Sequence, residues 1–360
     1  MTLYKISEQA IFTSEEFTMR EDENKKNGLN KIAKAYIHKL ALMLFYAMLF
    51  IACQKQEDSG QNRESKGIIL GFSQIGAESA WRTCNTRSVR DAAAAAGIQL
   101  LFSNAEQKQE NQIKAIRSFI AYQVDVIAFV PIVSSGWENV LEEAKEARIP
   151  VLVCDRKINI KNDDLYVGYI GTDSTEEGRL AAKFLLKKFE GHKASERPIR
   201  IVELSGTEGS SAAIERSAGF RECIENQSGF EIIYSASGDF LRSKGYELMR
   251  TLPFDFTEMD ALFSHNDGMT LGALDAMKEK GVNPGKDIII VSIDAEQAAI
   301  DALKRGDVNC VIECNPKQGP DIMNLARHLA RGESIPRIIN MTEQVFYEWD
   351  DLSDIPARGY

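Results

Sequence analysis

The chain has 360 residues, with 43 basic and 53 acidic side chains and a net charge of −10 at neutral pH. This length is enough for two lobes of ordinary domain size rather than one core. The acidic balance excludes a broad phosphate-binding surface, so nucleic acid is not an expected partner.

An apolar run near the start of the chain, at positions 40–52, ends at Cys53. Its thirteen residues are fewer than the roughly 20 that span a membrane, but they fit the core of a secretory signal peptide. Lys31, Lys34 and Lys39 supply the positive flank. The sequence Phe-Ile-Ala-Cys resembles the cleavage box of bacterial lipoproteins, which predicts that Cys53 becomes an acylated N-terminus. A short buried or amphipathic helix with an incidental cysteine is the alternative.

We therefore expect residues 1–52 to be a signal peptide with a long N-terminal extension. The first 30 residues are polar and acidic, so Met19 is an alternative start to Met1. Residues 53–66 are polar and are expected to form a lipid-anchored, flexible tether. The protein is then expected in the periplasm or on the outer face of the cytoplasmic membrane, held to it through N-terminal lipid alone.

Five cysteines follow the predicted anchor, and an odd number cannot all pair within one chain. Cys310 and Cys314 lie in a predicted strand and its exit, roughly 13 Å apart if extended, which is too far for a disulfide. Buried thiols are their expected state. There is no Cys-x-x-Cys pair, and the three histidines after Cys53 are widely scattered, so neither a metal nor another cofactor is predicted.

From Gly67 onward, short β-branched runs alternate with segments that have apolar residues at helical spacing. The predicted strands are 68–72, 98–102, 124–130, 150–154, 165–170, 199–204, 230–235, 261–264, 288–293 and 310–312. The predicted helices are 80–96, 109–122, 137–147, 175–189, 211–225, 243–251, 270–280 and 317–331. Such alternation predicts the α/β class, with doubly wound parallel sheets covered on both faces. A linker-like stretch at 191–198 separates two runs of similar rhythm, which indicates two lobes.

Planar polar groups and two aromatic rings follow the predicted strands in both lobes. In parallel sheets, ligands bind beyond the carboxyl ends of the strands. Sugar hydroxyls both donate and accept hydrogen bonds, which suits carboxylates, amides and guanidiniums, and the apolar sugar face suits an aromatic ring. Taken singly, several of these residues are typical of helix caps or core aromatics. The set is Glu78, Trp81, Arg82, Asp155, Arg156, Arg216, Phe240, Asn266, Asp294 and Glu313.

Long motifs in both lobes resemble one family. They are GFSQIGAESAWR (71–82), QKQENQIKAIRSF (107–119), IPVLVCDR (149–156), SAAIERSAGF (211–220), SGDFLRSKG (237–245), HNDGMTLGAL (265–274) and PGKDIIIVSID (284–294). With these motifs the chain resembles the periplasmic sugar-binding proteins of ABC importers of the ribose and galactose type, and most of all the galactofuranose- and galactose-binding members. The family usually has Gly where Ala295 stands.

The resemblance implies a type I periplasmic binding fold, with two Rossmann-like lobes joined by a three-strand hinge. The first lobe would comprise 66–171 and 314–339, and the second 172–313 and 340–355. The ten residues above would contact a monosaccharide as the hinge closes, and the protein, a monomer and not an enzyme, would deliver the sugar to a transporter permease.

Alternatives remain beside this interpretation. The same binding fold could serve a chemoreceptor or sensor kinase. Paired carboxylates also occur in glycosidases, although Asp155 beside Arg156 is expected to stay ionised and to be a poor general acid. A nucleotide-binding enzyme is disfavoured because neither a phosphate loop nor a Gly-x-Gly-x-x-Gly motif is present. A sugar-responsive repressor would need a DNA-binding helix-turn-helix where this chain has an export signal.

Overall fold

The computed structural model describes residues 67–191, 197–225 and 227–360, which form one compact unit. The predicted signal peptide, the tether and Cys53 lie outside the described residues. Within the described ranges, no helix combines the length and apolarity needed to cross a membrane.

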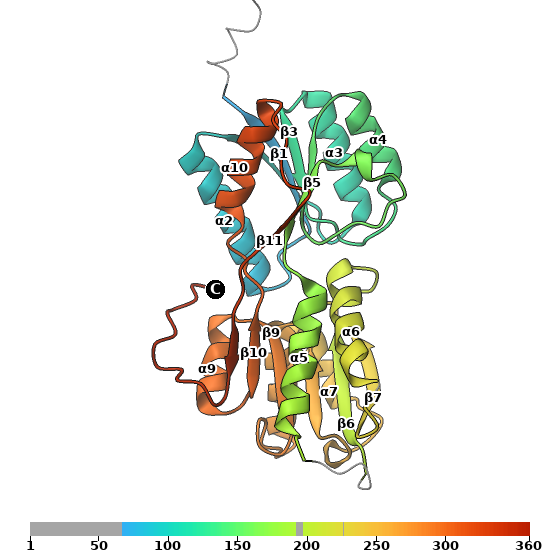
Figure 1. The fold of residues 1–360 in the computed structure, drawn as a ribbon, viewed down its shortest axis with the longest axis vertical. Coiled ribbons are helices and arrows are strands. Elements are labelled where there is room, and N and C mark those ends of the chain that lie inside the picture. Colours follow the sequence, from blue (N-terminus) through green and yellow to red (C-terminus); the bar gives the residue numbers. More distant parts are fainter. Residues whose placement is uncertain (1–66, 192–196, 226) are drawn as a thin grey trace, which may run out of the picture. The chain divides into compact units, whose positions relative to one another are not determined.

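The first sheet has six parallel strands in the order β11-β5-β4-β3-β1-β2. Consecutive strand residues face opposite sides of a sheet. Leu152 thus packs with the core under α2 and α10, while Val151 and Val153 pack with the core under α3 and α4. Figure 1 shows the two pairs of helices on opposite faces. The strands are β1 (Ile69–Gln74), β2 (Gln99–Asn104), β3 (Val126–Phe129), β4 (Val151–Asp155), β5 (Gly168–Gly171) and β11 (Ile338–Asn340), and the helices are α2 (Ala80–Ala96), α3 (Gln109–Tyr122), α4 (Glu138–Glu146) and α10 (Gly319–Ala330), with a 3₁₀ turn at Asp163–Leu165.

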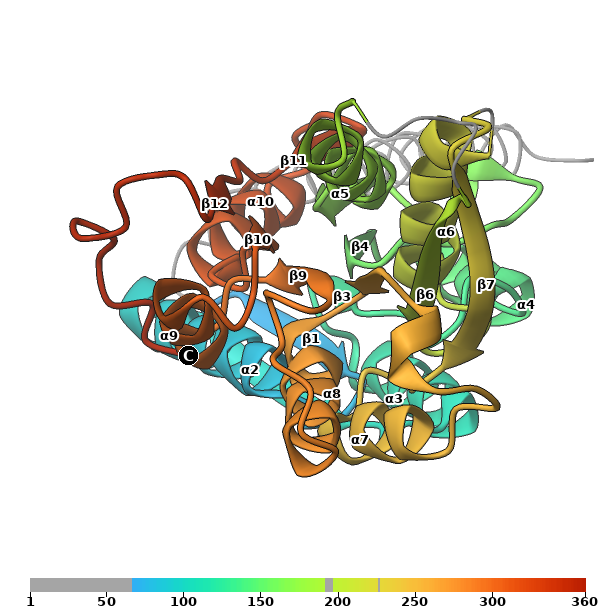
Figure 2. The same ribbon diagram turned by 90° about the horizontal axis from the view of Figure 1, so that it is seen from below.

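The second sheet repeats this plan in the order β12-β10-β9-β8-β6-β7, with only β12 antiparallel to its neighbour. Leu262 faces the core under α7, α8 and α9, and Phe263 faces the core under α5 and α6. Figure 2 shows α5 and α6 across the strands from α7 and α8. The strands are β6 (Ile199–Ser205), β7 (Phe230–Ser237), β8 (Ala261–Ser264), β9 (Ile289–Asp294), β10 (Cys310–Glu313) and β12 (Val345–Tyr347), and the helices are α5 (Ser174–Lys188), α6 (Ser211–Ile224), α7 (Arg242–Arg250), α8 (Asp267–Glu279) and α9 (Gln297–Arg305), with a 3₁₀ turn at Phe256–Glu258.

The predicted doubly wound α/β fold with two lobes is confirmed. Helix α9 and the short strands β11 and β12 are additions that the sequence pattern did not predict. The chain passes between the two sheets three times, through residues 172–173, 314–318 and 341–344. Because eleven of the twelve strands are parallel within two separate sheets, their carboxyl ends create two rims, and the functional site is to be sought there.

Candidate functional site

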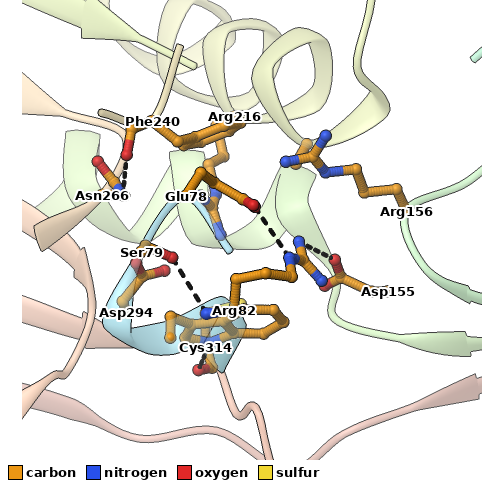
Figure 3. Close-up of a pocket in the computed structure, with 12 residues that line it drawn as sticks. Glu78, Ser79, Arg82, Asp155, Arg156, Arg216, Phe240, Asn266, Asp294 and Cys314 are labelled. Atoms are coloured by element: carbon orange, nitrogen blue, oxygen red, sulfur yellow. Dashed lines mark hydrogen bonds and ion pairs between the residues drawn. The ribbon is translucent and has the colours of Figure 1, made fainter. Parts of the chain in front are cut away.

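A pocket lies where the carboxyl ends of strands from both sheets meet (Figure 3). About 320 Å³ of empty space, open solvent included, lies among its lining residues. Nine of the ten sequence-predicted residues line it, and Glu313 does not. The lining residues are Glu78, Ser79, Trp81, Arg82, Asp155, Arg156, Ala212, Arg216, Phe240, Asn266, Asp294 and Cys314.

In the first lobe, Arg82 joins two carboxylates. Its Nε lies 2.9 Å from Glu78 Oε1 and its Nη2 lies 2.7 Å from Asp155 Oδ2, with all three side chains buried. Burial would raise the pKa of Glu78, but the nearby charges of Arg82 and Arg156 hold it below its ordinary value. Glu78 Oε2 and Arg82 Nη1 are buried without a hydrogen-bond partner among the described residues. This half of the pocket therefore has one ionised acceptor and one donor left for a ligand.

Arg156 supplies the largest set of unused donors. Its side chain is 4% exposed, and within the described part of the chain its guanidinium makes a single hydrogen bond, from Nη1 to Ile132 O at 3.2 Å. Burial lowers the pKa of Arg156 to about 10, and the positive charge of Arg82 adds to this shift. A guanidinium has five N–H donors in one plane. Figure 3 draws no hydrogen bond or ion pair between Arg156 and another lining residue, so its remaining donors are open to a ligand.

Arg216 anchors the half of the pocket that the second lobe provides. It lies on α6, which can approach α5 closely because Gly178 of α5 has no side chain. A Cβ at Gly178 would come within 2.1 Å of the Arg216 carbonyl oxygen. Its Nε donates to Glu177 Oε2 at 2.7 Å and its Nη1 donates to His265 O at 2.6 Å. These contacts, together with burial, fix the guanidinium and leave Nη2 available toward the pocket.

Asp294 brings a carboxyl group that none of the described residues hydrogen-bonds, although its side chain is only 5% exposed. Burial raises its pKa well above the ordinary value, against the lowering effect of Arg216. Asn266 differs, because it caps α8: its Oδ1 accepts from Met269 N at 3.0 Å and its Nδ2 donates to Phe240 O at 3.2 Å. Asn266 thus acts as a helix cap, which was the alternative to a sugar contact in the sequence analysis.

Two aromatic rings complete the lining. The Phe240 ring lies against Gly206, where a Cβ would come within 1.9 Å of it, and the guanidinium carbons of Arg156 and Arg216 lie 5.0 and 5.9 Å from the ring centroid. Trp81 donates from its indole Nε1 to Cys314 O at 2.6 Å. Both rings are therefore held in place before any ligand binds.

Three lining residues and one neighbour have unusual backbone angles. Asp155, Phe240 and Asp294 have φ of 61°, 60° and 128°, and Ala295, next to Asp294, has φ of 61°. This left-handed region is rarely adopted by residues other than glycine, and such strain clusters at ligand clamps. The angle at Ala295 explains why a glycine suits this position.

Glu313 stands apart from the other predicted residues. It ends β10, where its Oε1 pairs with Arg358 Nη2 and its Oε2 accepts from Gln344 N at 3.0 Å. Both oxygens are thus engaged by the protein rather than directed to the pocket.

Direct contacts between the lobes were not predicted from the sequence. Glu296 Oε1 accepts from Trp81 N at 2.9 Å, and Ser134 N donates to Gly209 O at 2.8 Å. Lys157 N donates to Ser211 Oγ at 2.7 Å, and the Lys157 ammonium pairs with a carboxylate of α6, that of Glu215, at 2.7 Å. Lys157 directly follows the predicted site residues Asp155 and Arg156, and this position is the only feature of the sequence that could have drawn attention to it. The lobes are in contact around the pocket, which is a closed arrangement.

One further cluster could be considered for a metal. Atoms of Glu177 in α5 and of Cys314 and Glu343 in two of the passages between the sheets lie within 4.8 Å of one another. Burial raises the pKa of the Cys314 thiol well above its ordinary value, and burial together with Glu177 raises that of Glu343 to about 9. Since Arg216 already neutralises Glu177, these groups are better suited to hold protons than a divalent cation.

Comparisons with known proteins agree with this geometry. Residues 70–334 match the model of the periplasmic binding protein domain family. The galactofuranose-binding protein YtfQ of Escherichia coli is 40% identical over 283 residues, which cover 78% of this chain and 87% of that one. A Mycobacterium smegmatis protein in complex with β-D-fucofuranose is 42% identical, with a TM-score of 0.76 over 78% of this chain and 92% of that one.

A third relative is the periplasmic binding component of the arabinose ABC transporter of Shewanella sp. ANA-3, solved with α- and β-L-arabinofuranose. It is 42% identical, with a TM-score of 0.72 and the same coverage of 78% and 92%. The family resemblance predicted from the sequence motifs is confirmed. The chain belongs to the periplasmic binding protein family.

Proposed function

We propose that the protein captures a monosaccharide in its five-membered, furanose form between the two lobes and passes it unchanged to an ABC importer. The observation that carries the proposal is that one pocket holds both a buried, mostly unpaired guanidinium, that of Arg156 on the first lobe, and an unpaired carboxyl, that of Asp294 on the second. Both rims offer donors and acceptors, which suits hydroxyl groups that must do both. Of the three relatives described above, one is named for galactofuranose and two were solved with fucofuranose and arabinofuranose.

Capture follows from closure of the lobes. A ligand held by Arg82, Asp155 and Arg156 on the first lobe gains the contacts of Arg216 and Asp294 only when the second lobe meets it. Differential affinity of this kind shifts the equilibrium toward the closed state. A sugar that lacks one hydroxyl would leave a buried polar group unpaired, at a cost of roughly 1–3 kcal/mol, so selectivity should be sharp.

Ring size is the property to test first. Titration calorimetry with methyl β-D-galactofuranoside and methyl β-D-galactopyranoside compares two glycosides that differ only in the ring. We expect binding of the furanoside and at least tenfold weaker binding of the pyranoside. Tryptophan fluorescence of the wild type and of Trp81→Phe, which retains Trp137 and Trp349, assigns the signal to the pocket. Failure of both glycosides and of free arabinose, galactose and ribose to bind would refute the proposal.

Hydrolysis of a sugar is a second candidate, favoured by one observation. The raised pKa of Asp294 would suit a general acid, and Glu78 and Asp155 offer carboxylates on the other rim. Against it, the relatives are named as binding proteins. Incubation with p-nitrophenyl furanosides should release no p-nitrophenol, and release that is lost in Asp294→Asn would establish the enzyme.

Attachment to the membrane through a lipid on Cys53 is part of the same proposal, because Cys53 follows an apolar run and a small residue. Cells that express the full chain should incorporate labelled palmitate into it, and Cys53→Ser should not be labelled. Labelling of both proteins, or of neither, would contradict the lipid anchor.

A further inference from the structure

The segment 358–360, which we call the strap, lies beside the turn that carries Asp294. Tyr360 Oη donates to Asp294 O at 3.2 Å, and Arg358 Nε donates to Ala295 O at 3.1 Å. Asp294 and Ala295 are the two residues of this turn with φ of 128° and 61°. Both carbonyl groups of an unfavourable backbone turn are therefore held by the strap, which makes the turn depend on partners outside its own sequence.

The strap is itself fixed to α9, directly after the same turn. Arg358 N donates to Gln297 Oε1 at 2.9 Å, and Gln297 N donates to Tyr360 O at 2.7 Å. Gln297 is the first residue of α9, so its N–H is one of those that a helix leaves without an internal partner. The strap satisfies this group while it holds the turn.

The strap also reaches the first lobe. Arg87 Nη2 donates to Gly359 O at 2.7 Å. Arg87 belongs to α2, whose first turn carries Trp81 and Arg82 of the pocket. The strap thus links the turn of Asp294 in the second lobe to the helix that supplies the first lobe's half of the site.

Arg358 determines where Glu313 points. Its Nη2 pairs with Glu313 Oε1 and lies 3.0 Å from the hydroxyl of Tyr360, and the Arg358 side chain is 11% exposed. Without this guanidinium, Glu313 would be a partly buried carboxylate with only the N–H of Gln344 as a partner. Such a charge is unfavourable and would seek another donor.

We propose that Arg358 and Tyr360 are positioning residues that hold the Asp294 carboxyl toward the ligand and slow the release of bound sugar by tying its turn to α2. The proposal rests on the proposed function, because it assigns the strap to the same pocket. It concerns side chains that do not line that pocket and act through the backbone of Asp294 and Ala295.

Stopped-flow fluorescence with methyl β-D-galactofuranoside tests the proposal. Arg358→Met, which removes the hydrogen bonds to Ala295 O, Glu313 and the Tyr360 hydroxyl, should raise the dissociation rate about tenfold. Tyr360→Phe and Arg87→Met should raise it about two- to fivefold. The association rate should stay within about twofold of wild type, a split that general destabilisation would not produce. Arg305→Met, which removes an exposed arginine paired with Asp307 in the same lobe, is the matched control and should release sugar at the wild-type rate.

Two further variants separate the strap's contacts. Arg358→Lys should behave like Arg358→Met, because one ammonium cannot serve both Ala295 O and the Glu313 carboxylate. The double variant Arg358→Met/Glu313→Gln removes the freed charge as well. Its dissociation rate should stay raised if the turn is what matters. Restoration of the wild-type rate in the double variant, or wild-type rates in both Arg358→Met and Tyr360→Phe, would overturn the proposal.

If the wild type binds no furanoside, the proposed function fails, and hydrogen exchange of the ligand-free protein decides the role of the strap. Cys314 N donates to Asp294 O, the carbonyl that Tyr360 also holds. Its amide should exchange at least tenfold faster in Arg358→Met than in Arg305→Met. Equal exchange in the two variants would show that the strap does not position the turn.

Discussion

The pocket's two halves differ in how their polar groups are held. On the first lobe, Glu78, Arg82 and Asp155 are joined to one another by ion pairs. On the second lobe, Arg216 is fixed by a residue outside the pocket and by a backbone carbonyl, and Asp294 has no side-chain partner among the described residues. A network of opposite charges keeps its members ionised, whereas an isolated buried carboxyl tends to hold a proton. The polar side chains of the first half are thus positioned by ion pairs, and those of the second half by the backbone around them.

Removal of Arg82 should break the first half outright. Arg82→Met leaves two buried carboxylates without their partner, and breaking a buried pair in this way costs about 3–5 kcal/mol of stability. We expect a large fall in melting temperature and no measurable sugar binding by calorimetry. Arg90→Met, on the same helix but exposed, is the control and should change neither property. Wild-type stability in Arg82→Met would mean that the ion pairs do not hold this half together.

Replacement of one carboxyl group in each half should sharpen the comparison. Asp155→Asn should weaken sugar binding about 10- to 150-fold, since hydrogen bonds to charged groups contribute about 1.5–3 kcal/mol. Asp294→Asn should weaken it about two- to tenfold, since the carboxyl of Asp294 holds a proton and hydrogen bonds of neutral groups contribute about 0.5–1.5 kcal/mol. Their effects on stability should have opposite signs. Asp155→Asn weakens the pair with Arg82 and should lower the melting temperature. Asp294→Asn removes a carboxyl whose raised pKa opposes folding at neutral pH and should raise the melting temperature slightly. Changes of the same sign would contradict the distinction between the halves.

The pH dependence of stability should come from the cluster behind Arg216. Burial raises the pKa of Glu343 to about 9 in the folded protein, from 4.5. Below pH 4.5 both states hold the proton and stability is unaffected. Between pH 4.5 and 9 the unfolded chain loses this proton while the folded protein keeps it, so the contribution of Glu343 becomes steadily less favourable to folding.

Glu343→Gln has no such proton and tests this directly. The variant should melt at a higher temperature than wild type at pH 8 and at a similar temperature at pH 4, as measured by thermal unfolding across that range. Glu333→Gln, an exposed glutamate of the first lobe, is the matched control. If the difference in melting temperature between wild type and Glu343→Gln stayed constant from pH 4 to 9, Glu343 would not be a source of the pH dependence.

The smallest effect is expected at the backbone turn itself. Ala295→Gly relieves a left-handed angle, which costs an alanine about 1–2 kcal/mol, but it also loses a buried methyl group and gains freedom in the unfolded chain. These contributions nearly cancel, so the change in unfolding free energy should stay within about 1 kcal/mol, with sugar affinity preserved. Ala299→Gly, in the interior of α9, should be clearly more destabilising. Equal losses in the two variants would argue against strain at Ala295.

Much of the fold follows from local patterns, and the exceptions are informative. Strands such as β8 and β9 are buried throughout and mostly apolar, a pattern that can be identified without knowledge of their neighbours. β11 and β12 have three residues each, and their pairing depends on how the chain returns between the sheets. α9 begins only two residues after β9 ends, so no linker in the sequence marks it off as a separate element.

The candidate site shows the same division. Asp155 and Asp294 end parallel strands, so their place at the rim of the sheet follows from topology alone. Which carboxylate meets which arginine does not follow, because partners such as Glu313 and Arg358 lie 45 positions apart in the chain. The bond from Trp81 N to Glu296 spans 215 positions and forms only when the lobes touch. Contacts that arise from docking leave no periodic signal in the sequence.

The bridge from Lys157 to Glu215 has a consequence for the conditions under which the lobes meet. It joins charges of opposite sign across the lobes, with the lysine side chain 35% and the glutamate side chain 22% exposed. Dissolved ions screen partly exposed charges over distances of about 8 Å at physiological ionic strength. The affinity of the protein for a neutral molecule should therefore fall as the salt concentration rises, although the molecule itself carries no charge. In a saline habitat the protein would hold such a molecule less firmly than in fresh water.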